Sequence, residues 1–266
     1  MFKLKIIFVL LALLDIQLVG VNVAYAEDTP SSSIKISEDT GFFAKEKWGA
    51  SYLNYMNGPS FTESSGSSIN HFLTLKRKLN PDWSLSLTVR PDSNFGNENK
   101  SLTMSDPYLK LNYPIIYKNE NGVKVSGDLI YYMPISESSK ADKLTGIISP
   151  RLSTSYEVGN LNFLYLFIPK AYLNTVAKDG QKVYSHSHYL ATGYKISNLV
   201  TFDFALNPAW TIKRNQTTEF NNLPAMPGMT FNFNKDVSLS PYLEVSLLKP
   251  SNKSSSIGAV LNYTLL

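Results

Sequence analysis

The chain has 266 residues, of which 43% are hydrophobic and 17% are charged, and its formal net charge is +4 at pH 7. A charge this close to balance gives no indication of a nucleic-acid partner. The absence of cysteine excludes disulfides, thiolate metal sites, cysteine nucleophiles and a bacterial lipoprotein anchor. The 16 tyrosines and 14 phenylalanines favour β-strands over long soluble helices.

The N-terminus has the pattern of a secretory signal peptide. Lys3 and Lys5 form a basic start, residues 6–14 are an unbroken apolar run, and residues 24–26 (AYA) fit the small-x-small cleavage pattern. The apolar run is shorter than the ~20 residues that a membrane-spanning helix requires. We therefore predict a signal peptide at 1–26, cleaved after Ala26. Residues 27–45, rich in turn formers and in charges of both signs, are predicted to form an N-terminal lead or partial plug.

From residue 46 to 266, polar and apolar residues alternate with the period of two that is typical of β-strands. Twelve strands are predicted, at residues 46–57, 69–79, 83–91, 104–114, 123–134, 145–158, 161–172, 187–196, 199–210, 227–234, 237–248 and 257–265. Tight turns between them alternate with longer segments at 58–68, 92–103, 135–144, 173–186, 211–226 and 249–256. Short turns at one end and longer loops at the other are typical of antiparallel up-and-down barrels of the outer membrane.

The alternation also predicts which side chains face outward. In the stretch 83–91, WSLSLTVRP, apolar Leu85, Leu87 and Val89 take turns with small polar residues, so one face of the strand suits lipid. Aromatic residues near the short-turn ends are expected to form a girdle at the periplasmic headgroups. The girdle candidates are Trp48, Trp83, Tyr113, Tyr156, Phe163, Tyr194, Phe202, Phe231 and Tyr263.

The exported start, the twelve alternating segments, the girdle and the final stretch IGAVLNYTLL together resemble the Gram-negative outer-membrane β-barrel proteins, porin-like members included, over residues 46–266. Such proteins typically end in an aromatic residue, whereas this chain ends in Leu265-Leu266. The resemblance implies an all-β transmembrane barrel in the cell outer membrane, contact with outer-membrane lipid, insertion by the barrel-assembly machinery, and no cofactor. It identifies no subfamily and no oligomeric state.

The opposite faces of the strands carry the charged residues that could line a pore. These candidates are Lys76, Arg90, Asp106, Lys110, Lys124, Asp128, Arg151, Glu157, Asp203 and Glu244. Charged side chains in a wet lumen bias permeation by sign and size, which predicts a passive porin-like channel for small solutes. In residues 161–168, LNFLYLFI, both faces are apolar, so Leu164, Leu166 and Ile168 are expected to pack against the lead segment or to contact an apolar substrate.

Two alternatives to a channel stay open. His71, with a serine and an acid, could form a catalytic triad in a lipid-modifying barrel enzyme of the phospholipase or lipid A deacylase type, because a triad is recognised by geometry.

His186 and His188 lie two residues apart but lack further metal ligands nearby, which favours exposed rim positions over a metal site. No catalytic or metal residue is therefore assigned. In a structural or surface-interaction barrel, paired charges would close the lumen and function would reside in loops such as 211–226.

Overall fold

The structure is a computed structural model that describes residues 47–60, 67–80, 83–95, 100–112, 116–216, 218–248 and 255–264. The predicted signal peptide, the lead segment and the girdle candidate Tyr113 lie outside these residues. In the described part of the chain, no helix has the length and apolar character needed to cross a membrane.

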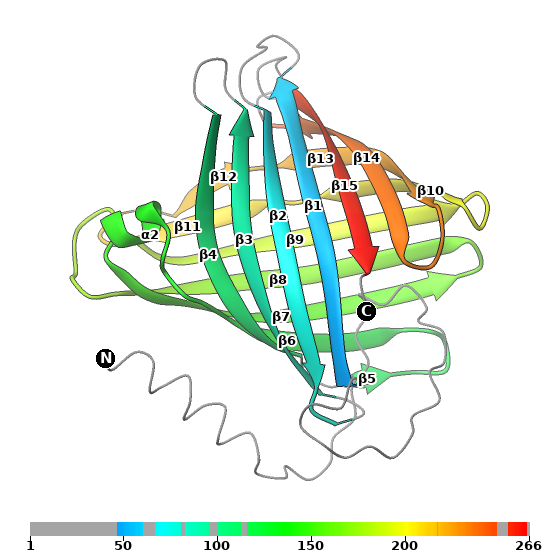
Figure 1. Cartoon of the computed structure of the whole chain (residues 1–266), viewed down its shortest axis with the longest axis horizontal. Helices are drawn as coiled ribbons and strands as arrows, with labels where there is room; N and C mark the ends of the chain where they lie inside the picture. The colour runs from blue at the N-terminus through cyan, green and yellow to red at the C-terminus, as the bar shows by residue number, and fades with distance from the viewer. Residues whose placement is uncertain are drawn as a thin grey trace.

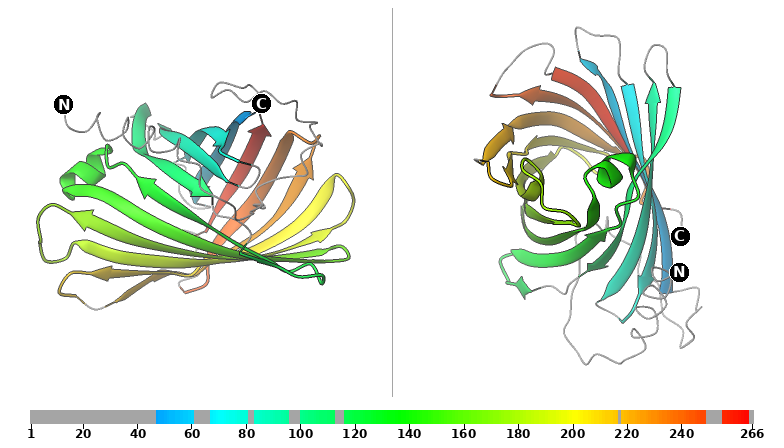
Figure 2. Two further views of the ribbon diagram at one scale, coloured as in Figure 1. Left: turned by 90° about the horizontal axis from the view of Figure 1, so that it is seen from below. Right: turned by 90° about the vertical axis from the view of Figure 1, so that its left-hand side faces the viewer.

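Twelve strands form a closed antiparallel barrel, as the alternation predicts. In chain order they are β1 (Trp48–Ser60), β2 (Ser67–Lys78), β3 (Ser84–Phe95), β4 (Lys100–Asn112), β6 (Lys124–Tyr132), β7 (Leu144–Val158), β8 (Leu161–Asn174), β9 (Lys182–Lys195), β10 (Val200–Leu206), β13 (Pro224–Asn232), β14 (Val237–Ser246) and β15 (Ser255–Thr264). Neighbours in the chain pair with each other, and β15 closes the ring by pairing with β1 (Figures 1 and 2). Closure leaves no edge strand in the ring, which is the condition for a sheet to cross a bilayer.

Three further strands extend the barrel wall. β5 (Tyr117–Lys118) pairs with β6, while β11 (Ala209–Lys213) pairs with β9 and with β12 (Glu219–Asn222). The expectation that residues 211–226 form a surface loop is therefore wrong for most of that segment. It is a hairpin that continues β10 and leads into β13, and Lys213 Nζ donates to Glu219 Oε1 across it at 2.9 Å. The segment is short and polar, so periodicity alone does not reveal its strands.

One short helix, α2 (Glu137–Ala141), interrupts the connection between β6 and β7. The side chain of Ser136 caps its first turn by accepting from the backbone N–H of Ser139. In the end-on view of Figure 2, α2 lies within the outline of the barrel opening. This connection therefore folds inward.

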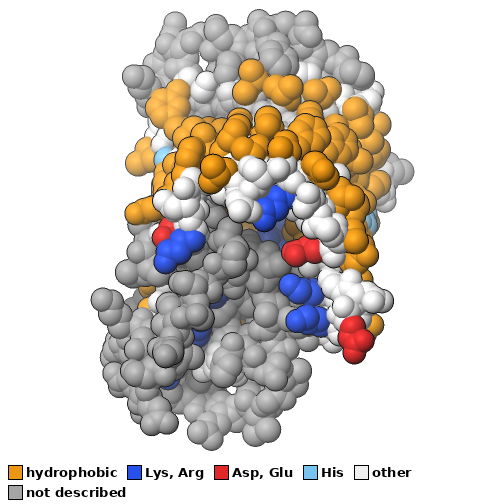
Figure 3. All heavy atoms as spheres, turned by 90° about the vertical axis from the view of Figure 1, so that its right-hand side faces the viewer, with side chains coloured by type: hydrophobic (Ala, Val, Ile, Leu, Met, Phe, Trp, Pro, Cys, Tyr) orange, Lys and Arg blue, Asp and Glu red, His pale blue; other side chains and the backbone are white. Residues whose placement is uncertain are grey.

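Burial in the barrel wall is the reverse of that in a soluble protein. In β3, the inward Ser84, Ser86 and Thr88 are 6%, 2% and 1% exposed, whereas Leu87 and Val89 on the other face are 39% and 37% exposed. The same alternation continues around the wall, and Figure 3 shows the resulting band of hydrophobic side chains over the outside. The exposed apolar area is far larger than scattered surface leucines would give, and it matches a surface that contacts lipid.

Candidate functional site

Small polar side chains cover the inner wall of β2, β3, β6 and β7. The hydroxyls of Thr74 and Thr88 lie 2.8 Å apart, and those of Ser126 and Ser153 lie 2.9 Å apart. Asn112 donates to Ser84 Oγ between β4 and β3. Each pair joins neighbouring strands at positions that face inward, so the interior is held by hydrogen bonds more than by hydrophobic packing.

A cluster of cations and tyrosines lies on the inner faces of β4, β6, β7 and β8. Arg151 Nη2 donates to the Tyr132 hydroxyl at 2.8 Å, and Lys170 Nζ lies 5.4 Å from the centre of the Tyr132 ring. The Tyr108 ring packs against Tyr132 with centroids 5.2 Å apart. Asp128 stands opposite Arg151 in the β6–β7 register and is 3% exposed. Of the predicted lining residues, Asp128 and Arg151 thus come together in one charged cluster.

The predicted lining residue Asp106 holds the inward connection in place. Its Oδ1 accepts the backbone N–H groups of Ile135 and Ser136 at 2.9 and 2.8 Å, and its Oδ2 accepts the hydroxyl of Ser139. A register shift in the β3–β4 pairing, between Thr88 and Arg90, lies opposite Asp106. Three hydrogen bonds to a buried carboxylate make Asp106 an anchor for α2 and its flanks.

A second polar network joins the two ends of the ring. Tyr242 of β14 donates to Asn57 Oδ1 at 3.1 Å, Asn57 donates to Asn70 Oδ1 at 2.9 Å, and Asn70 donates to Asp92 Oδ1 at 2.9 Å. The guanidinium of Arg90, another predicted lining residue, lies 4.9 Å from the centre of the Phe72 ring. The strand pairs that close the barrel are therefore bonded through their inward side chains as well as through their backbones.

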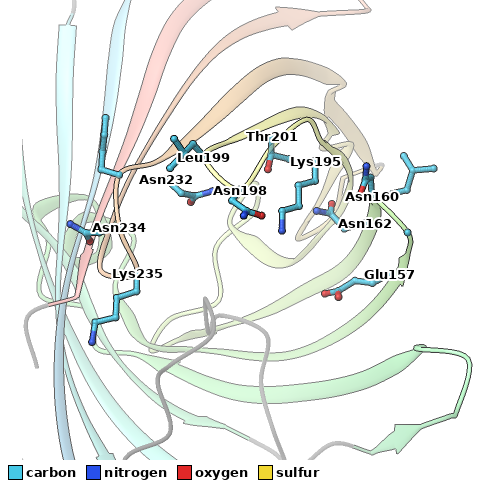
Figure 4. Close-up of a pocket in the computed structure, with 13 residues that line it drawn as sticks. Glu157, Asn160, Asn162, Lys195, Asn198, Leu199, Thr201, Asn232, Asn234 and Lys235 are labelled. Atoms are coloured by element: carbon cyan, nitrogen blue, oxygen red, sulfur yellow. The ribbon is translucent and has the colours of Figure 1, made fainter.

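The short-turn end of the barrel opens into a cavity of about 550 Å³. The side chains that surround it are mainly amides with three charged groups (Figure 4): Glu157, Asn160, Asn162, Lys195, Asn198, Asn232, Asn234 and Lys235, together with Thr201. They come from β7, β8, β9, β10 and β13 and from the tight turns 159–160, 196–199 and 233–236. Of these residues, only Glu157 is among the predicted pore-lining residues. Asparagines in turns also have a purely conformational explanation, so the sequence alone does not mark them as lining residues.

The other predicted lining residues take inward positions in the register. Lys76 of β2 and Lys110 of β4 stand on either side of the buried Ser86, and Asp203 of β10 accepts the hydroxyl of Thr230 at 2.6 Å. Lys124 pairs with Ser155, and Glu244 pairs with Ser256. The inward apolar strip is also present, since Leu164 and Leu166 pair with Ala191 and Tyr189. Its expected partners in the lead segment lie outside the described residues.

The girdle candidates among the described residues occupy the outer wall near the short turns. Tyr194, Phe202, Phe163 and Tyr263 are 49%, 47%, 43% and 41% exposed. Trp48, Trp83, Tyr156 and Phe231 are half-buried. Tyr156 and Phe163 stack across β7 and β8 with ring centroids 6.3 Å apart, and Arg77 lies 5.9 Å from the Trp48 ring centre.

All three histidines lie on strands with side chains on the outer wall, and two of them are packed in an aromatic cluster. His186 stacks on Trp210 at 5.1 Å, Trp210 stacks on Phe220 at 4.7 Å, and His188 Nδ1 lies 2.7 Å from the Tyr165 hydroxyl. Both histidines are half-exposed, and their assignment to exposed rim positions stays a prediction. Within the described ranges, no group of three or more His, Cys, Asp or Glu residues is arranged to hold a metal ion.

The third histidine, His71, lies in a polar cluster formed by Tyr52, Asn54, His71 and Ser93, which we call the His71 cluster. His71 Nε2 lies 3.1 Å from Ser93 Oγ, and His71 Nδ1 lies 2.6 Å from the Tyr52 hydroxyl. Asn54 Nδ2 donates to the same hydroxyl at 2.8 Å. The sequence points to His71, but it carries no signal that His71 contacts Ser93.

Among solved structures, the chain is similar to an outer membrane channel from Pseudomonas putida F1, with a TM-score of 0.53 and 11% sequence identity, over 82% of this chain and 94% of that one. It is also similar to the NanC porin, with a TM-score of 0.52 and 11% identity, over 82% of this chain and the whole of the porin. This is the fold of outer-membrane porins and channels. No protein-family profile matches the sequence of this porin-like barrel, and no curated protein matches it.

Proposed function

We propose that the protein is an outer-membrane channel through which small polar solutes diffuse passively. The observation that carries this proposal is the closed barrel with an apolar outer band and a polar, hydrogen-bonded inner wall. The apolar band suits lipid, and the polar interior suits water and hydrated solutes. The likeness in fold to two outer-membrane channels supports the same location and role.

The cavity at the short-turn end would be the periplasmic mouth of the channel. Its amides can both donate and accept hydrogen bonds, so they can replace part of the hydration shell of a neutral solute. Lys195 and Lys235 outnumber Glu157 there, which biases the mouth towards small anions. The charged cluster around Tyr132 and the inward α2 connection would set the narrowest part of the path.

Conductance in planar lipid bilayers tests this proposal. The full chain, refolded and inserted, should give discrete conductance steps, with a preference for anions in the reversal potential under a salt gradient. Lys195→Glu should shift that potential towards cations. The matched change Lys182→Glu, at the exposed opposite end of β9, should leave it nearly unchanged.

Three results would contradict the proposal. A folded, inserted protein that gives no conductance steps under conditions where a known porin does would favour the closed structural barrel. Equal shifts of the reversal potential for Lys195→Glu and Lys182→Glu would show that the solute does not pass through the cavity at the short-turn end. Fractionation of expressing cells, with the protein absent from the outer membrane, would contradict the proposed location.

A further inference from the structure

The His71 cluster lies on the outer wall of the barrel, where a channel has no use for it. In the strand register, Tyr52 stands opposite Leu73, and Ser93 stands opposite Ile69 and Leu102. Leu73 is 43% exposed and Leu102 is 75% exposed on that face. Polar side chains facing lipid are costly, and an ionisable residue among them is by default a candidate functional group.

The four side chains form one continuous chain of contacts. Ser93 Oγ meets His71 Nε2, His71 Nδ1 meets the Tyr52 hydroxyl, and Asn54 meets the same hydroxyl, all within 2.6 to 3.1 Å. Asn54 is 5% exposed, and its Oδ1 has no hydrogen-bond partner. Because amide oxygen and nitrogen are assigned from the network and not observed, turning this amide lets Oδ1 accept the Tyr52 proton. Tyr52 then accepts from His71 Nδ1–H, which leaves Nε2 free to take a proton from Ser93.

A nucleophile, a base and a group that orients the base are the components of serine hydrolases, and they are recognised by geometry. We propose that Ser93 and His71, positioned by Tyr52 and Asn54, hydrolyse acyl esters of membrane lipids at the outer surface of the barrel. This activity is independent of the proposed channel, because its residues face away from the lumen.

The height of Ser93 in the wall fits this substrate class. Strands tilted by ~40° climb about 2.5 Å per residue along the barrel axis. Ser93 lies ten positions beyond the girdle candidate Trp83, hence about 25 Å higher, which equals the height of the apolar band of such barrels. The cluster therefore reaches the far boundary of the hydrocarbon layer, where lipid ester groups lie. Exposed Phe95, Leu102 and Met104 beside it would contact the acyl chains.

The reaction would proceed in two steps with water as the second reactant. Ser93 Oγ attacks the carbonyl carbon of the ester while its proton passes to His71 Nε2. The bond between that carbon and the ester oxygen breaks, and His71 gives the proton to the departing alcohol. Water then attacks the acylated serine and gives a proton to His71, the fatty acid leaves, and Ser93 regains its proton.

Release of fatty acid by the purified full-length protein tests the proposal. One arm uses mixed micelles of phospholipid and detergent, and the other uses micelles that contain lipopolysaccharide, so that the two sources of acyl ester are distinguished. Ser93→Ala should abolish release, and His71→Asn should lower its rate by roughly 10² to 10⁴-fold. An alkyl fluorophosphonate should label the wild type on Ser93, located by peptide mass.

The second hydrogen-bonded histidine on the outer wall provides a matched control. His188 meets Tyr165 as His71 meets Tyr52, so His188→Asn should leave fatty-acid release unchanged. Tyr52→Phe should lower the turnover number and spare the Michaelis constant, because Tyr52 positions the base and does not touch substrate. If the folded wild type releases no more fatty acid than Ser93→Ala in either arm, or carries no label on Ser93, the proposal is wrong. Unchanged conductance of Ser93→Ala would exclude a folding defect.

Discussion

The assignment of the outer face can be tested by placing a charge in the apolar band at Leu87. Leu87 is 39% exposed in β3 and stands opposite Leu75, which is 47% exposed. It lies four positions beyond Trp83, hence about 10 Å into an apolar band about 25 Å high, close to the middle. Arginine near the midplane costs about 2 to 4 kcal/mol on a lipid-facing strand, so Leu87→Arg should lower the free energy of unfolding by that amount.

Reversible urea unfolding in lipid vesicles, followed by tryptophan fluorescence, measures this change. Val158→Arg is the matched control, because Val158 is 48% exposed on the outside of β7 but sits next to the short turn, where the cost falls to about 0 to 1 kcal/mol. In a soluble protein both exposed positions would tolerate arginine within about 0.5 kcal/mol. Equal and small costs for the two variants would therefore refute the lipid-facing assignment.

Three further predictions concern the anchor, a close contact and the N-terminus. Asp106→Ala removes the acceptor of three hydrogen bonds from the α2 connection, so single-channel conductance should rise or become noisier; an unchanged trace would mean that α2 does not narrow the path. Gly258→Ala places a methyl group against the Tyr242 ring and should cost about 1 to 3 kcal/mol of unfolding free energy, but much less in a Tyr242→Ala background; equal costs in both backgrounds would refute the contact. Mass spectrometry of the mature protein from the outer membrane should give an N-terminus at Glu27, and an uncleaved chain would contradict the predicted signal peptide.

The sequence alone determined the barrel and the orientation of its strands. A period of two is enough to separate Leu85, Leu87 and Val89 from Ser84, Ser86 and Thr88, because successive side chains on a strand point to opposite faces. The same alternation shows that one face of the strands carries little charge, and the composition shows that cysteine is absent. Twelve segments with this pattern then leave a closed sheet as the arrangement that satisfies all backbone groups in lipid.

Only the tertiary structure decided which side chains meet across strands. His71 and Ser93 are 22 positions apart, and they converge because the β2–β3 register sets Ile69 opposite Ser93. Alternation fixes the face of a side chain but not the stagger between strands, and a register shift such as the one opposite Asp106 leaves no periodic signal. For the same reason, the sequence points to His71 but does not reveal its contact with Ser93, and it predicts a loop where the β11–β12 hairpin lies.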